Sequence, residues 1–231
     1  MHGNLQRQSD CRICNSVFEW EAIEDQGRIW EIAPSVCDGC EGMMANGSEA
    51  TLQARAERIS SFKGSIPKLF RDTDKARLPS VLTDAVDEWM YSSRGLAFAG
   101  PSGRGKTRAM FLLLQREAGE GRSVDFITST DFDHISRDQF SDDAMERNQA
   151  KEKLRSIRSV KILLLDDLGK SRLTDRCEAE LFSLFDSRTS AALPTLWTSN
   201  LSADGLKAMV TPDRAAPLLR RLTEFTTIIT P

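Results

Sequence analysis

The chain has 231 residues, of which 40% are hydrophobic and 28% are charged, and its formal net charge is −3. This composition is typical of a protein with one main core and room for a small additional module. No apolar run approaches the length of a membrane span, and residues 1–10 have neither the apolar core of a secretion signal nor the arginine-rich character of a transit peptide. We therefore expect a cytoplasmic protein that does not enter a membrane.

The N-terminal segment is acidic and carries four of the five cysteines. Residues 1–44 hold three Arg against eight Asp or Glu, net −5, whereas the remaining 187 residues carry a net charge of +2. Affinity for nucleic-acid phosphates comes mostly from Lys and Arg, so this segment is better suited to bind protein. Its cysteines form two Cys-x-x-Cys pairs, Cys11 with Cys14 and Cys37 with Cys40, which 22 residues separate.

A hairpin can bring the two cysteine pairs together into a structural zinc site. Residues 17–20 and 28–32 alternate apolar and charged side chains, and Gln26 with Gly27 supplies a turn between them. A segment this short needs a bound metal or a similar cross-link to fold alone, and a reducing cytosol argues against disulfides. We predict a small zinc ribbon over residues 1–44, with redox-active or unrelated buried thiols as alternatives. The fifth cysteine, Cys177, is expected to be a buried small hydrophobic residue.

Residues 45–78 are predicted to be a helical and irregular connection, because helix-compatible sequence gives way to Ser, Gly and Pro. Residues 81–89 then place apolar side chains on one helical face. From residue 95 onward strands and helices alternate, which predicts an α/β domain over 79–231 with a mostly parallel sheet and helices on both faces. The expected strands are 96–99, 124–128, 160–165, 195–198 and 226–230, and the expected helices include 108–118, a polar region ending at 158, and 178–189.

The sequence Gly-Pro-Ser-Gly-Arg-Gly-Lys-Thr at residues 100–107 matches a phosphate-binding loop. It follows an apolar strand and precedes a helix, which is the order that such a loop requires. Glycines let backbone N–H groups face phosphates, Lys106 can reach the β and γ phosphates, and the Thr107 hydroxyl can ligate Mg²⁺. The alternative is a glycine turn between two core elements. We predict a nucleotide site made by Gly100, Pro101, Ser102, Gly103, Arg104, Gly105, Lys106, Thr107 and Arg108.

Polar side chains follow two further predicted strands, at the edge where open α/β sheets bind ligands. Asp166 and Asp167 come after the strand at 160–165, and Asn200 follows the strand at 195–198. We expect Asp166 to hold Mg²⁺, Asp167 to polarise the attacking water, and Asn200 to orient water or contact the γ-phosphate. Alternatively, the two acids cap the next loop and Asn200 only turns the chain.

Two groups of basic residues are candidates for binding charge. Arg214, Arg220 and Arg221 could supply an arginine to the transition state in a neighbouring subunit, or they are solvated arginines on a helix face. The second group either follows single-stranded nucleic acid or remains solvated, and the lack of interleaved aromatic residues favours the solvated face. This group, at helical spacing, is Arg147, Lys151, Arg155 and Arg158.

These motifs together resemble the DnaC-type helicase loaders of the AAA+ ATPases, a branch that also contains the IstB-type transposition helpers. The resemblance runs from about Ile66 to Thr230. Its most selective parts are Asp-Asp-Leu-Gly at 166–169 and Thr-Ser-Asn at 198–200. It is also carried by residues 64–70, 100–107, 180–188 and 194–201.

The resemblance implies a role for each part of the chain. Asp166 and Asp167 correspond to the Walker B acids and Asn200 to the sensor residue, while the arginine-rich tail supplies an arginine between subunits. Pro217 stands where that arginine is usually found, so the resemblance does not choose among the three candidates. It further implies ATP as the nucleotide, a core without a C-terminal helical lid, self-association when ATP is bound, and contacts with single-stranded DNA. It also implies an N-terminal part that binds the replicative helicase.

Three functional hypotheses follow. The first is an ATP-dependent helicase loader that uses ATP binding and slow hydrolysis as a switch in replication initiation. The second keeps the ATPase but changes the client to a transposase. The third belongs to another class, a zinc-dependent protein-binding adaptor whose nucleotide is structural.

Overall fold

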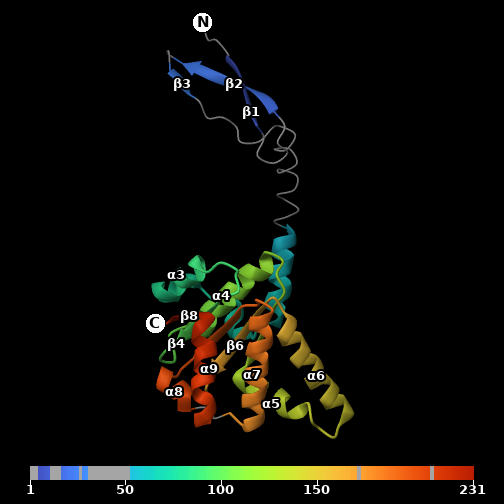
Figure 1. Cartoon of the computed structure of the whole chain (residues 1–231). Helices are drawn as coiled ribbons and strands as arrows, with labels where there is room; N and C mark the ends of the chain where they lie inside the picture. Colours follow the sequence, from blue (N-terminus) through green and yellow to red (C-terminus); the bar gives the residue numbers. More distant parts are fainter. Residues whose placement is uncertain (1–4, 11–16, 26–27, 31–52, 171–172, 209–210) are drawn as a thin grey trace. The chain divides into compact units, whose positions relative to one another are not determined.

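The computed structural model describes residues 5–10, 17–25, 28–30, 53–170, 173–208 and 211–231 (Figure 1). The chain forms two compact units, Met1–Ala56 and Glu57–Pro231. The cysteines predicted to bind zinc lie outside the described residues, and the described residues contain no group of three or more His, Cys, Asp or Glu side chains placed to hold a metal ion. The zinc ribbon therefore stays a prediction.

The described part of the first unit is a three-stranded antiparallel sheet. Strands β2 (Val17–Asp25) and β3 (Arg28–Trp30) pair with Ile23 opposite Trp30, so the expected hairpin is confirmed, although its first strand is longer than predicted. Strand β1 (Leu5–Asp10) pairs with the other edge of β2 and was not predicted from the sequence. Across this pair, the Gln8 amide donates a hydrogen bond of 3.1 Å to Glu19.

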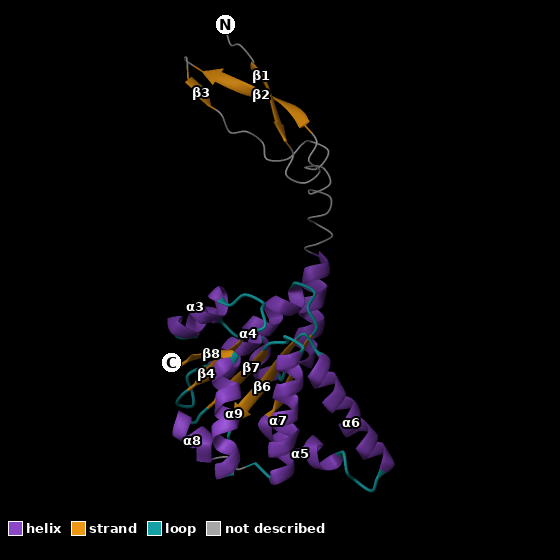
Figure 2. Cartoon of the chain, viewed as in Figure 1, coloured by secondary structure: helices purple, strands orange, loops and turns teal. Residues whose placement is uncertain are grey.

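The second unit is built on a five-stranded sheet in which every described pairing is parallel. Its order is β5-β6-β7-β4-β8. Figure 2 shows these strands at the centre of the unit with helices around them. The α/β fold predicted from the alternation of elements is therefore confirmed. The strands are β4 (Gly95–Ala99), β5 (Val124–Thr128), β6 (Ile162–Leu168), β7 (Thr195–Ser199) and β8 (Thr226–Ile229).

Helices connect these strands, and several begin where a side chain caps the first turn. The Thr128 hydroxyl accepts from the backbone N–H of Asp131, and Asp143 accepts from the N–H groups of Met145 and Glu146. In addition to a helix over residues 53–65 and a 3₁₀ turn at Lys75–Arg77, the structure contains α2 (Lys68–Arg71), α3 (Ser80–Glu88), α4 (Lys106–Gly119), α5 (Ser129–Asp138), α6 (Ala144–Ser159), α7 (Asp175–Ser190), α8 (Ala203–Ala208) and α9 (Pro212–Glu224).

Two apolar cores lie on opposite faces of the parallel sheet, because successive strand residues point to opposite sides. Leu163 and Leu165 of β6 belong to one core, with apolar residues of α5, α6, α7 and α9. Ile162 and Leu164 belong to the other core, with α3 and α4. Cys177 of α7 is fully buried in the first core, as predicted.

Residues 57–78, part of the predicted connection, lie within the second unit. Ile66 is fully buried in the core that α3 and α4 form. The Arg58 guanidinium donates two hydrogen bonds, of 3.0 and 2.6 Å, to the carbonyl of Gly119 at the end of α4. None of the helices in the described part of the chain is long and apolar enough to cross a bilayer.

Candidate nucleotide-binding site

The loop between β4 and α4 has the conformation that its glycines permit. Gly103 and Gly105 have φ values of 79° and 85°, a region that side chains with a Cβ rarely adopt. Gly105 is the N-cap of α4, so the helix begins at Lys106. A Cβ on Gly105 would lie 2.6 Å from Cδ2 of Leu78, so glycine is also required here by a close approach.

The side chain of Lys106 folds back against this loop and also reaches Asn200. Its Nζ donates to the carbonyls of Gly100 and Pro101, both at 2.7 Å, and to Oδ1 of Asn200 at 2.8 Å. All three ammonium hydrogens therefore have acceptors. Burial lowers the pKa of Lys106, and the two carboxylates that follow β6 act in the opposite direction by stabilising its charge. A partly desolvated cation at this position is suited to phosphate oxygens.

A bulge carries the two acids at the end of β6. Leu165 pairs with Trp197 and Leu168 pairs with Ser199, so two residues of β6 stand opposite the single residue Thr198 of β7. Those two residues are Asp166 and Asp167. A bulge of this kind redirects side chains at a sheet edge.

Asp166 and Thr107 provide oxygen ligands of the kind that Mg²⁺ prefers. Oδ1 of Asp166 accepts hydrogen bonds from the hydroxyls of Thr107, at 2.9 Å, and Thr198, at 2.6 Å. Burial raises the pKa of Asp166, while these two hydrogen bonds lower it in part. The hydroxyl and the carboxylate lie side by side at the start of α4, so the residues present fit a magnesium ion bound with a phosphate.

Asp167 is held in an unusual backbone conformation. Its φ of 59° is left-handed, and its N–H donates to the Thr198 hydroxyl at 2.9 Å. Its carbonyl accepts from the Ser129 hydroxyl at 2.8 Å. Its carboxylate accepts from the Asn200 amide at 2.7 Å, with Lys170 Nζ 3.7 Å from the other oxygen. Asn200 thus links Asp167 to the lysine of the loop.

A pocket of about 690 Å³ joins these groups. The structure brings the loop, both acids and Asn200 to one place, as expected for residues that follow the carboxyl ends of parallel strands. Sequence reasoning gave no role in the site to two parts of the wall: Thr198, which was noted only as the end of a strand and as part of the Thr-Ser-Asn motif, and the segment from Phe70 to Pro79. Residues that line the pocket are Phe70, Asp72, Thr73, Asp74, Arg77, Leu78, Pro79, Ser102, Gly103, Arg104, Gly105, Lys106, Thr107, Arg108, Asp166, Asp167, Thr198 and Asn200.

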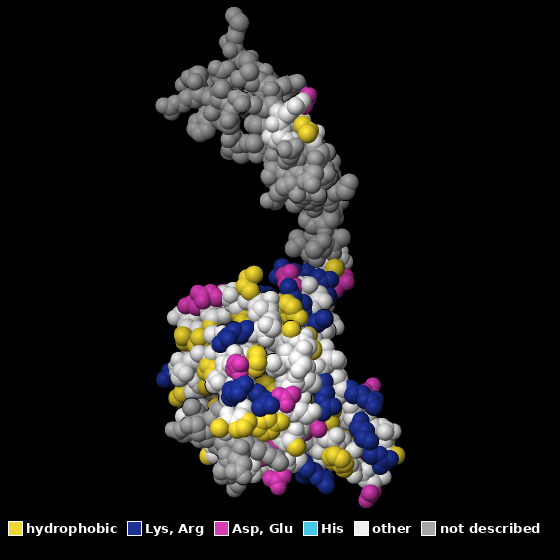
Figure 3. All heavy atoms as spheres, viewed as in Figure 1, with side chains coloured by type: hydrophobic (Ala, Val, Ile, Leu, Met, Phe, Trp, Pro, Cys, Tyr) yellow, Lys and Arg dark blue, Asp and Glu magenta, His cyan; other side chains and the backbone are white. Residues whose placement is uncertain are grey.

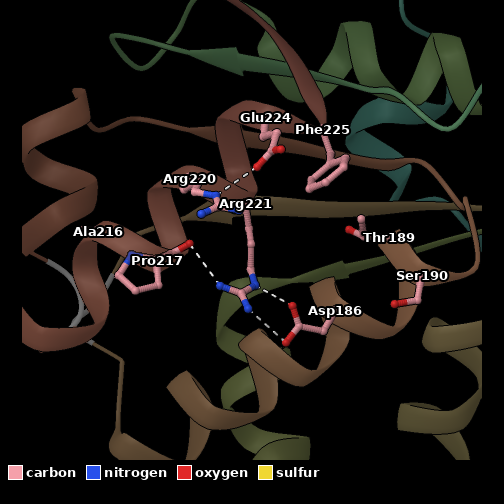
Figure 4. Close-up of a pocket in the computed structure, with 9 residues that line it drawn as sticks. All are labelled: Asp186, Thr189, Ser190, Ala216, Pro217, Arg220, Arg221, Glu224 and Phe225. Atoms are coloured by element: carbon pink, nitrogen blue, oxygen red, sulfur yellow. Dashed lines mark hydrogen bonds and ion pairs between the residues drawn. The ribbon is translucent and has the colours of Figure 1, made fainter.

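The C-terminal end of α9, which carries Arg220 and Arg221, lies beside the start of β4. The carbonyl of Phe225, directly after α9, accepts from the N–H of Gly95 at the start of β4, whereas the phosphate loop follows the end of β4. A second pocket of about 550 Å³ lies here, lined by residues of α7 and α9 (Figure 4). Within one chain, this pocket and the loop share no lining residue.

Arg220 and Arg221 differ in their surroundings, as Figure 4 shows. Arg221 pairs with both carboxylate oxygens of Asp186 on α7, and its guanidinium lies 5.2 Å from the ring centre of Phe182. Arg220 is 80% exposed and pairs with Glu224 one turn along the same helix. Arg214 lies near the start of α9, and its side chain is outside the described part of the structure.

Basic side chains gather over α6 in the surface view (Figure 3). Arg147 donates to the carbonyl of Ser141 at 2.7 Å, and Arg158 pairs with Glu180. Lys151 and Arg155 are exposed. Two members of the predicted stripe are therefore partly engaged by the protein.

The parallel sheet, the glycine loop before α4 and the paired acids after β6 define a P-loop NTPase of the AAA+ type. Among solved structures, the crystal structure of DnaI matches with a TM-score of 0.59 and 21% identity, covering 71% of this chain and 94% of that one. The DnaC helicase loader matches with a TM-score of 0.52 and 20% identity, covering 65% and 86%. These likenesses show the fold.

Residues 68–230 match the model of the IstB-like ATP binding protein family, and the chain belongs to this family. The replicative helicase loader DnaI of Bacillus subtilis (strain 168) is 29% identical over 115 residues, 49% of this chain and 35% of that protein. An uncharacterized protein of Escherichia coli (strain K12), YdaV, is 27% identical over 126 residues, 54% and 49%. The matches span about a third to a half of these relatives. Membership of an ATP-binding family implies a nucleotide and Mg²⁺ at the site.

Proposed function

We propose that the chain is an ATP-dependent loader of a replicative DNA helicase, in which ATP binding and hydrolysis change its grip on helicase and single-stranded DNA. The observation that carries the proposal is the hydrogen-bonded set at one sheet edge, in which Asn200 joins Lys106 to Asp167 while Thr107 bonds to Asp166. A site in which the lysine that binds phosphate is linked to the second acid is suited to ATP hydrolysis as well as to ATP binding. The likeness to loaders named DnaI and DnaC supports the choice of client.

Each residue of the set has a part in hydrolysis. Lys106 exchanges the loop carbonyls for phosphate oxygens, and Thr107 with Asp166 holds Mg²⁺. The ion, when bound, neutralises the charge that develops on the phosphate oxygens. Asp167 orients the attacking water and accepts its proton, and Asn200 holds Asp167 until the nucleotide is in place.

An arginine reaches the nucleotide from a second copy of the chain. Arg220 and Arg221 line a pocket that shares no residue with the nucleotide pocket, so we propose that the arginine comes from another subunit and that the chain self-associates in the ATP-bound form. Of the two arginines whose side chains the structure describes, Arg220 is the stronger candidate, since it is exposed, whereas the ion pair with Asp186 engages Arg221. Transition-state arginines supplied by a partner increase turnover by about 10³-fold or more in GTPases.

The acidic N-terminal module serves as the helicase-binding part, with zinc held by Cys11, Cys14, Cys37 and Cys40. Its net charge of −5 over residues 1–44 disfavours nucleic acid as its partner. The exposed basic residues of α6 contact single-stranded DNA. Salt weakens such contacts, so the affinity of the chain for single-stranded DNA should fall as the salt concentration rises.

A second candidate function has one observation in its favour. The family model that matches residues 68–230 is described as IstB-like, so the client could be a transposase, with the same ATPase chemistry. Capture experiments with a purified replicative helicase and with a purified transposase distinguish the two.

Two measurements on the full chain test the proposal. ATP hydrolysis is measured for the wild type and for Asp167→Asn, with and without single-stranded DNA. We expect the variant to bind ATP but to lose turnover by about 100-fold or more. Equal background rates for both proteins would instead favour an adaptor with a structural nucleotide.

The second measurement is capture of a purified replicative helicase. We expect the wild type to retain it, and a variant with Cys11→Ser and Cys14→Ser to lose both zinc and the helicase while keeping ATP binding. If both proteins capture the helicase equally, the N-terminal module is not the adaptor.

A further inference from the structure

Two hydroxyl groups hold the backbone at the pair of acids. We infer that Thr198 and Ser129 are positioning residues that fix Asp167 for water activation, an inference that rests on the proposed ATP hydrolysis. In the sequence, Thr198 was noted only as part of the Thr-Ser-Asn motif and Ser129 was not singled out, and neither residue belongs to the phosphate loop.

The backbone at Asp167 needs such support. Asp167 and Ala192 are the two non-glycine residues with positive φ in the described part of the chain. Left-handed conformations at such residues persist where neighbouring groups hold them, and they are frequent at functional sites. The bulge opposite Thr198 also removes part of the regular pairing between β6 and β7 that would otherwise fix this corner.

Thr198 supports both acids through one hydroxyl group. The hydroxyl donates to Oδ1 of Asp166 at 2.6 Å and accepts from the N–H of Asp167 at 2.9 Å. Thr198 is 2% exposed, so water cannot easily replace these bonds. The side-chain bond to one acid and the backbone bond to the other set their relative position.

Ser129 holds the other side of the same residue. Its hydroxyl donates to the carbonyl of Asp167 at 2.8 Å, and it is 5% exposed at the first position of α5. The N–H and C=O groups of Asp167 are therefore bonded to hydroxyls from two different elements, β7 and α5. With both groups held, the residue cannot easily return to the extended conformation, which would turn its carboxylate away from the pocket.

Loss of these hydroxyls should reduce turnover more than ATP binding. We expect the loop and Lys106 to hold the nucleotide, and the hydrogen bonds of Lys106 go to Gly100, Pro101 and Asn200 rather than to either hydroxyl. A displacement of about 1 Å at a catalytic group can reduce turnover by about 100-fold. We therefore expect Thr198→Val to lower kcat by about 10- to 100-fold, with the Kd for ATP within about threefold of the wild type.

Matched variants separate positioning from stability. Thr198→Ser keeps the hydroxyl and should restore kcat to within about threefold. Ser129→Ala should lower kcat by about tenfold. Two variants serve as controls. Thr195→Val, on the same strand as Thr198, removes a buried hydroxyl that accepts a hydrogen bond of 2.9 Å from Arg188. Ser136→Ala, on the same helix as Ser129, removes a buried hydroxyl that donates a hydrogen bond of 2.7 Å to the carbonyl of Phe132. Both controls should lower Tm and leave kcat unchanged.

The inference is overturned if Thr198→Val turns over ATP at the wild-type rate, or if Thr195→Val loses as much kcat as Thr198→Val. If Thr198→Val does not fold, the decision falls to Ser129→Ala, for which an unchanged kcat is the contradicting result. A wild type no faster than Asp167→Asn refutes hydrolysis itself, and the positioning role with it. This outcome is distinguishable because the comparison does not involve Thr198 or Ser129.

Discussion

Replacement of Gly105 by alanine tests whether the observed loop conformation is the one that binds the nucleotide. Gly105 has a φ of 85°, and a Cβ there would lie 2.6 Å from Cδ2 of Leu78. A left-handed conformation costs a residue with a Cβ about 1–2 kcal/mol. The contact adds to this cost, although the end of the Leu78 side chain can move. Gly103, with a φ of 79° and no atom within 4 Å of an added Cβ, has the backbone cost alone.

The cost should appear mainly in ATP affinity. A free loop can relax away from the strained conformation, whereas a loop that surrounds phosphates cannot, so binding must restore the strain. A cost of about 1–2 kcal/mol corresponds to a loss of affinity of roughly 5- to 30-fold. We expect this loss for Gly103→Ala and a larger one for Gly105→Ala, whose added methyl group also displaces Leu78 in the pocket wall.

Calorimetric titration with a non-hydrolysable ATP analogue and Mg²⁺ measures these affinities. Gly64→Ala is the control, because Gly64 lies in a helix with no atom within 4 Å of an added Cβ. We expect its affinity to equal that of the wild type, with the helix more stable by up to about 1 kcal/mol. Wild-type affinity for both Gly103→Ala and Gly105→Ala would refute the reasoning.

Three further predictions concern the core and the second pocket. Arg221→Ala should lower the free energy of unfolding by about 1 kcal/mol, because it loses a bidentate ion pair and an aromatic contact. Arg220→Ala should change this free energy by less than about 0.5 kcal/mol. Urea denaturation measures both values, and an equal loss of stability in the two variants would contradict the prediction. Gly95→Ala places a Cβ 2.0 Å from the carbonyl oxygen of Thr195, and it should destabilise the fold by about 3 kcal/mol; an unchanged Tm would show that this contact is not made. Burial raises the pKa of Cys177 to about 12, so its thiol should resist a thiol reagent at pH 8 until the protein unfolds, and rapid labelling of native protein at this residue would be inconsistent with the described core.

The core strands and the phosphate loop could be predicted because their patterns are local. Ile162 and Leu165 belong to cores on opposite faces of one sheet, and a strand buried on both sides shows as a continuous apolar run. The loop requires its glycines at φ values that other residues avoid. Asp167 and Asn200 meet because parallel strands end at the same edge.

The details that make the site specific depend on long-range register and could not be predicted. The bulge at Asp167 follows from the register of β6 and β7, in which Leu168 pairs with Ser199; in a regular ladder Asp167 would pair with Ser199. The two bonds of Thr198 follow from that register. The position of Arg221 beside Asp186 depends on how α9 packs against α7, which no sequence spacing indicates. The cysteine module was predicted from spacing, and its four ligands lie outside the described residues.

A crystal structure grown with Mg²⁺ and a non-hydrolysable ATP analogue is the most direct test. We predict that the triphosphate occupies the loop from Gly100 to Thr107, that Mg²⁺ lies between Thr107 and Asp166, and that Lys106 has left the carbonyls of the loop for phosphate oxygens. The proposal is contradicted if the nucleotide binds elsewhere, or if Lys106 keeps its bonds to the carbonyls of Gly100 and Pro101 with the nucleotide present.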